Sequence, residues 1–125
     1  MDNKHFGLEL ERRTQSFAIL LIRYSSSLPE TAELRVIKNQ VVKSGSSIGA
    51  NYREANKSRS KADFYNKIKI CQAESNETIY WLEILKEILD RKGSMLEDLI
   101  SESKQFLAIF TTIANKLKNH IPKSP

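Results

Sequence analysis

The sequence has one cysteine, two histidines and three prolines in 125 residues, and the first two shortages exclude whole classes of protein. A single cysteine cannot form an internal disulfide, which suits a reducing compartment. Di-iron helical bundles use Glu-x-x-His motifs, but neither His5 nor His120 follows a glutamate by three residues. No arginine precedes either histidine by the four to six residues typical of certain helical ribonucleases. We therefore expect no metal, no cofactor and no enzymatic activity.

Long apolar runs are also missing. The longest, residues 17–22, is far shorter than the ~20 residues that cross a bilayer. The first five residues lack the apolar segment of a signal peptide. We expect a cytoplasmic protein with no membrane partner.

The composition indicates one domain with a modest excess of positive charge. A chain of 125 residues with 40% hydrophobic residues can form a single core. Twenty basic and 15 acidic residues, interspersed along the chain, give a net charge of +5. This excess permits an anionic partner without requiring one.

Apolar residues recur every three or four positions through most of the chain, which is the period of amphipathic helices. They predict helices at about residues 8–26, 30–55, 61–91 and 95–119. Pro29 suits the first turn of the second helix, and Gly93 suits the end of the third. Ser60 with Asp63, and Ser94 with Glu97, resemble capping boxes. Four helices with short connections predict an all-α, antiparallel up-down-up-down four-helix bundle over residues 1–125.

Small residues crowd into the second helix between positions 44 and 50. Each glycine there costs about 1 kcal/mol of helix propensity, but an apolar stripe continues through the segment without a proline. Gly45 and Gly49, one turn apart, would let another helix approach closely. Asn51 falls on the same stripe, and a buried amide there would fix the register of the bundle.

Residues 47–54 and 60–64 resemble the signature hairpin of a bacterial family of small four-helix-bundle proteins. Proteins of this family were first found as reading frames inside intervening sequences of large-subunit ribosomal RNA genes. The resemblance spans roughly residues 17–89 and departs at Gly49, where many members carry proline, and at Ala55, where many carry glycine. It implies the bundle fold and a homopentameric ring, but no activity, since the role of the family is unsettled. The matching motif positions are Lys43, Ser47, Ile48, Asn51, Glu54 and Glu77.

The second and third helices should form a hairpin that turns near residue 58. Antiparallel pairing then places Lys43 near Ala73, within a turn of Glu74 and Glu77. A hydrogen-bond and ion-pair layer that fixes register is the simpler interpretation, and a functional pocket is the alternative. Cys71 lies on the main apolar stripe, and we interpret it as a buried, inert thiol.

A basic cluster surrounds this turn, and its members are Arg53, Lys57, Arg59, Lys61, Lys67 and Lys69. It is either a solvated helix end or a surface that binds RNA or DNA through phosphates. Tyr52, Phe64 and Tyr65 lie nearby and are candidates for stacking on bases. A nucleic-acid-binding accessory protein, similar to the accessory subunit of diversity-generating retroelements, is the alternative function.

The first and third helices carry more apolar residues than one core can absorb. The surplus either thickens the core or forms an exposed patch, which monomers rarely tolerate. We predict a closed homo-oligomer that serves as a non-enzymatic assembly or adaptor protein. The interface residues that we expect are Phe17, Leu20, Ile22, Trp81 and Ile84.

Overall fold

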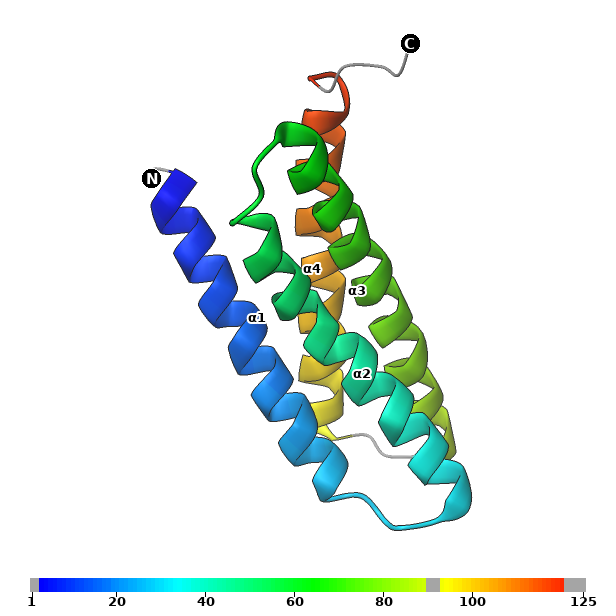
Figure 1. Ribbon diagram of the computed structural model, residues 1–125. Helices are drawn as coiled ribbons and strands as arrows, with labels where there is room; N and C mark the ends of the chain where they lie inside the picture. Colours follow the sequence, from blue (N-terminus) through cyan, green and yellow to red (C-terminus); the bar gives the residue numbers. More distant parts are fainter. Residues whose placement is uncertain (1–2, 90–92, 121–125) are drawn as a thin grey trace.

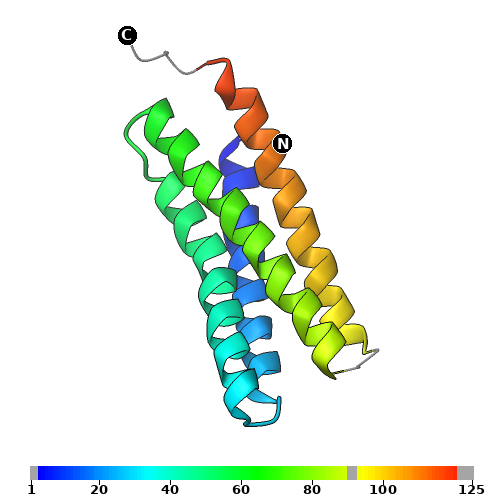
Figure 2. The ribbon, with the colours of Figure 1, turned by 90° about the vertical axis from the view of Figure 1, so that its right-hand side faces the viewer.

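The computed structural model describes residues 3–89 and 93–120, which form four helices without a strand among them. These are α1 (Asn3–Ser26), α2 (Ala32–Ala55), α3 (Lys61–Leu89) and α4 (Ser94–Lys118). They run alternately up and down, and α2 packs against α1 and α3 (Figure 1). The start of α1, the α2–α3 turn and the end of α4 lie at one end of the bundle (Figures 1 and 2). The predicted all-α four-helix bundle is confirmed.

The helix starts follow their capping side chains. Ser60 accepts a hydrogen bond from the backbone N–H of Asp63 at 3.1 Å, which confirms the capping residue predicted for α3. In α2 the cap is Thr31, whose hydroxyl accepts from the N–H of Leu34 at 3.1 Å. Pro29 therefore precedes the helix, and its predicted place in the first turn is wrong.

The starts of α1 and α4 also differ in detail from the prediction. α1 begins at Asn3, about one turn earlier than expected. The N-cap of α4 is Gly93, which supplies no side-chain hydrogen bond, so the capping box predicted at Ser94 is wrong. The predicted end of the third helix, near residue 91, lies outside the described residues.

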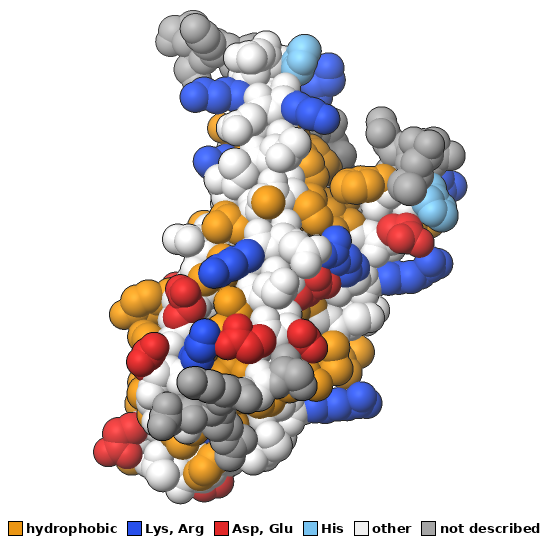
Figure 3. Space-filling view, turned by 180° about the vertical axis from the view of Figure 1, so that it is seen from behind, with side chains coloured by type: hydrophobic (Ala, Val, Ile, Leu, Met, Phe, Trp, Pro, Cys, Tyr) orange, Lys and Arg blue, Asp and Glu red, His pale blue; other side chains and the backbone are white. Residues whose placement is uncertain are grey.

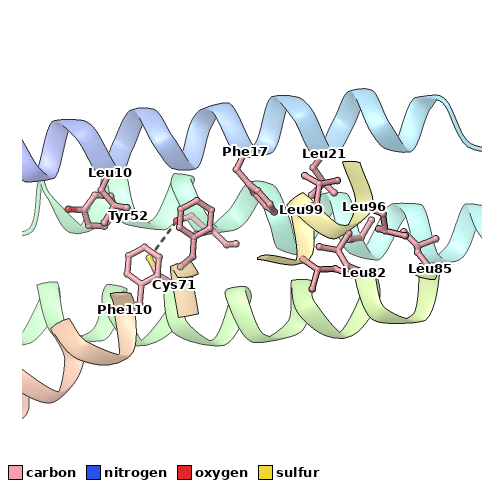
Figure 4. Packing of buried hydrophobic residues seen from close by; sticks show 14 of the residues in the cluster. Leu10, Phe17, Leu21, Tyr52, Cys71, Leu82, Leu85, Leu96, Leu99 and Phe110 are labelled. Carbon is pink, nitrogen blue, oxygen red and sulfur yellow. Dashed lines mark hydrogen bonds between the residues drawn. The ribbon is translucent and has the colours of Figure 1, made fainter. Parts of the chain in front are cut away.

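The core runs the length of the bundle and is filled from all four helices (Figure 4). Phe17 of α1 packs edge-on against Phe106 of α4, with ring centroids 5.3 Å apart. Tyr52, only 2% exposed, packs against Phe110. Asn51 is half-buried, so Tyr52 takes the core position that the stripe assigned to Asn51.

Glycines on α2 bring α1 close, as the sequence predicted. A Cβ on Gly49 would stand 2.8 Å from the hydroxyl oxygen of Thr14, and one on Gly45 would overlap a methyl group of Leu21. Larger residues at either position would push the helices apart.

α1 meets α4 over a shorter seam. Arg13 forms two hydrogen bonds with the carboxylate of Glu102, at 2.8 and 2.6 Å, and its guanidinium lies 5.2 Å from the centroid of Phe106. Nearer the start of α1, a groove of about 530 Å³ opens between Phe6 and residues of α4 that include Ile109 and Ile113. Hydrophobic side chains are visible between the two helices in Figure 3.

Candidate functional site

A buried hydroxyl pair joins the middles of α2 and α3. The hydroxyl oxygens of Ser44 and Thr78 lie 2.9 Å apart, and both side chains are fully buried. Thr78 also lies 2.7 Å from the carbonyl oxygen of Glu74. The polar middles of the two helices therefore meet in a hydrogen-bonded layer. The simple hairpin rule would place Ser44 opposite Gln72, so the register differs from the expected one.

The charged part of this layer lies nearer the surface. Burial raises the pKa of Glu74, and the neighbouring Glu77 raises it further, whereas Lys43 lowers it. Lys43 thus lies close to Glu74, as the sequence predicted. Neither glutamate forms an ion pair within the described part of the chain. Two surface hollows, of about 320 Å³ beside α1 and about 530 Å³ beside α4, are not lined by Lys43, Glu74 or Glu77.

The other motif residues of α2 bond mainly within their own helix. Ser47 donates to the carbonyl oxygen of Lys43 and Asn51 to that of Ser47, both at 2.8 Å. Asn51 is only half-buried and bonds within its own helix, so its expected burial in the core is wrong. Glu54 is exposed at the rim of the hollow between α1 and α2.

Cys71 is buried, and its thiol lies 3.5 Å from the carbonyl oxygen of Ile48. Burial raises its pKa to about 12, so the nucleophilic thiolate is scarce at neutral pH. No group of three or more potential metal ligands occurs among the described residues.

The basic cluster is exposed at the end of the bundle that carries the α2–α3 turn. Lys57, Arg59, Lys61 and Lys69 are exposed, whereas Lys67 is half-buried. Arg53 lies 3.5 Å from a carboxylate oxygen of Glu11, so its charge is partly compensated.

The aromatic residues beside the turn are poorly placed for stacking. Tyr52 is in the core, so its predicted role as a base-stacking residue is wrong. Phe64 and Tyr65 are half-buried and pack against the core.

Lys116 and Lys118 lie at the end of α4, at the same end of the molecule as the α2–α3 turn (Figure 2).

Apolar side chains remain exposed on the outer sides of α1 and α3. On α1, Ile19, Leu20 and Ile22 are 43–45% exposed. Phe17 is only 2% exposed and packs inside the bundle, so its assignment to an interface is wrong for this fold.

On α3, Ile70 and Ile88 are exposed, and Trp81 and Ile84 are half-buried against the core. Tyr80, at 58% exposed, stands edge-on to Trp81 with ring centroids 5.0 Å apart. The sequence interpretation missed Tyr80, although its position beside the second apolar stripe placed it on this surface.

A family model described as "23S rRNA-intervening sequence protein" matches residues 7–112, which include α2, α3 and most of α1 and α4. The chain belongs to this family. Among solved structures, the intervening-sequence protein is similar to a protein of unknown function from the S23 ribosomal protein family of Bacteroides thetaiotaomicron. The two are 30% identical, the match covers 83% of this chain and 96% of the other, and the TM-score is 0.73. No curated protein matches the chain.

The family match confirms the resemblance carried by the hairpin motif and extends it over more of α1 and into α4. The structural relative is itself described as having unknown function, so membership assigns no activity. None of the helices described for this intervening-sequence protein is long and apolar enough to span a membrane.

Proposed function

We propose that this intervening-sequence protein assembles with copies of itself into a closed homo-oligomer and acts as a non-enzymatic assembly or adaptor protein. The observation that carries the proposal is the apolar surface on the outer sides of α1 and α3. Ile19, Leu20 and Ile22 expose more than 40% of their area, whereas Phe17 and Leu21 of the same helix are buried in the core. Exposed apolar clusters on soluble proteins mark interaction sites.

The exposed apolar residues of α3 add to the same argument. Tyr80 and Ile88 are 58% and 54% exposed, and they flank the half-buried Trp81 and Ile84. Two apolar surfaces on one small domain favour association with another protein, and a second copy is always available at equal concentration. A ring of five is the number that the family resemblance implies, and we propose it on that ground.

Gel filtration of surface variants tests this function. Ile22→Glu places a charge on the α1 surface and should reduce the apparent size of the particle. Met95→Glu is the matched control, because Met95 is 42% exposed on α4, outside both surfaces. If the wild-type protein elutes as an oligomer and Ile22→Glu elutes at the same volume, the α1 surface has no part in assembly.

Binding of RNA or DNA by the basic end is the second candidate function. It is favoured by the four exposed basic side chains around the α2–α3 turn and by the lysines at the end of α4. In a ring whose copies share one orientation these basic ends would gather on one face, where their charges would act together on a polyanion. Mobility-shift titrations at two salt concentrations test this, because phosphate binding weakens steeply with salt.

A further inference from the structure

Two surfaces on opposite sides of the bundle have complementary chemistry. The first, which we call the α1 face, consists of the exposed residues Arg12, Ser16, Ile19, Ile22 and Arg23. The second, the α3 face, consists of Tyr80, Trp81, Glu83, Ile84 and Glu87, of which Trp81 and Ile84 are half-buried and the others exposed. α1 and α3 occupy diagonal corners and do not touch each other (Figure 1), so one copy can use both faces at once.

The charges at the edges of the two faces are opposite. Among the described residues, Arg12 and Arg23 lie beyond ion-pair distance of any carboxylate. Glu83 and Glu87 of the α3 face likewise form no ion pair within the described chain. The α1 face is therefore apolar with a basic edge, and the α3 face is apolar and aromatic with an acidic edge. Each face would repel the charges of another copy of itself and attract those of the other.

The two faces also stand at similar heights along the bundle. Gly49 of α2 lies against Thr14, and Ser44, five residues earlier, bonds Thr78. Because α1 runs antiparallel to α2, five residues after Thr14 brings Ile19 to the level of Ser44, and so within about a turn of Thr78. α1 and α3 run in the same direction (Figure 1).

Equal rise along the two helices carries this correspondence further. Three residues beyond Ile19, Ile22 stands within about a turn of Tyr80 and Trp81. Arg23 likewise stands within about a turn of Glu83. The apolar residues of the two faces thus lie at similar heights, and Arg23 lies near the level of Glu83, whereas Arg12 and Glu87 have no opposite charge at their own level.

We propose that a single repeated contact builds the oligomer, in which the α1 face of one copy packs against the α3 face of the next. This inference rests on the proposed homo-oligomer and names its interface. Copies related by rotation about an axis parallel to the bundle keep their helices level, so Ile22 meets Tyr80 and Trp81 with a shift of no more than about a turn along the axis. Contacts between two different surfaces are heterologous, and they form a ring when the rotation closes.

Cross-linking between single-cysteine additions tests this pairing. Ile22→Cys and Tyr80→Cys are made in separate chains with tags of different length, co-expressed, and treated with a short bismaleimide. Cys71 can remain, because its thiol is buried and its pKa is about 12. We expect a product that joins one chain of each kind, and little product from either variant expressed alone. A chain that carries both cysteines should give a ladder that ends at the number of copies in the ring.

Met95→Cys co-expressed with Tyr80→Cys is the matched control, since Met95 is exposed on α4. Efficient cross-linking of either variant with itself would indicate a contact between identical faces and overturn the proposal. A mixed product no greater than that of the Met95→Cys control would also overturn it. Light scattering on the same samples separates the two claims: a particle of one chain contradicts the homo-oligomer, whereas an intact oligomer without the mixed product contradicts only the pairing of faces.

Discussion

Gly45 of α2 lies directly against Leu21 of α1, so that a methyl group added to Gly45 would overlap the Cδ2 methyl of Leu21. Leu21 is fully buried, so its side chain can move aside only by displacing its neighbours in a close-packed core. The close approach of α1 to α2 therefore depends on the absence of a side chain at this position.

Gly45→Ala should destabilise the fold. Overpacking a core typically costs ~1–3 kcal/mol, which exceeds or offsets the ~1 kcal/mol of helix propensity that alanine adds, so we expect a net loss of about 1 kcal/mol. The measurement is the free energy of unfolding in urea. Gly7→Ala is the control: its new methyl would meet Asn56 at an ordinary 3.5 Å, so the variant should be at least as stable as wild type. A Gly45→Ala protein as stable as Gly7→Ala would refute the packing argument.

The buried hydroxyl pair should be energetically coupled. Thr78→Val removes a hydroxyl that bonds both Ser44 and the Glu74 carbonyl, and we expect a loss of about 1–2 kcal/mol. Ser44→Ala should cost less once Thr78 is valine, because its partner is already gone. Urea unfolding of both single variants and the double variant measures this coupling. Strictly additive losses would show that the two hydroxyls act independently.

Glu74 should make stability depend on pH. Its pKa is raised in the folded chain, so the ionised carboxylate is less favourable there than in the unfolded chain. Ionisation thus lowers stability at neutral pH, and the penalty disappears below the ordinary glutamate pKa, where both states are protonated. Glu74→Gln should therefore raise the Tm at neutral pH and have a smaller effect in acid. Asp98→Asn, an exposed change on α4 outside both proposed faces, is the comparison. A benefit that grew toward acid pH would contradict burial of the carboxylate as the cause.

The basic end should contribute to binding and not to folding. Replacing Lys57, Arg59 and Lys61 with alanine should leave the Tm within a few degrees, since exposed charges contribute little to stability. The same triple variant should weaken binding of RNA or DNA and flatten its dependence on salt. Mobility shifts with the wild-type and triple-variant proteins provide the comparison, and equal affinities would remove the turn from any binding surface.

The helices were predictable because their apolar residues repeat at the helical period. Which residue of each turn enters the core was not always predictable. A stripe that steps regularly by three and four residues has a mean period of 3.5, whereas the α-helix has 3.6 residues per turn. Over the length of α2 this mismatch turns the core side toward the next residue along the chain. Asn51, near the end of the stripe, is therefore only half-buried, and Tyr52 enters the core.

The register between α2 and α3 shows a second limit of sequence patterns. Side chains on a helix lean toward its N-terminus, and in antiparallel neighbours they lean toward each other along the axis. This lean accounts for part of the six-residue offset by which Ser44 meets Thr78 instead of Gln72.

No local sequence pattern predicted the packing of α1 against α4. Arg13 and Glu102 stand 89 residues apart, and neither belongs to a motif. The surplus apolar residues of α1 were evident in the sequence, but only the structure shows that Phe17 fills the core while Leu20 and Ile22 face outward.

The mass of the wild-type particle tests the central claim most directly, because the claim is that the exposed apolar faces of α1 and α3 join copies of the chain. Light scattering coupled to gel filtration at micromolar concentration measures it without a label or a variant. We predict one symmetric peak whose mass corresponds to more than two copies of the 14.4 kDa chain. Five copies is the expected number. A peak with the mass of a single chain would contradict the account, and a stable dimer would contradict the ring.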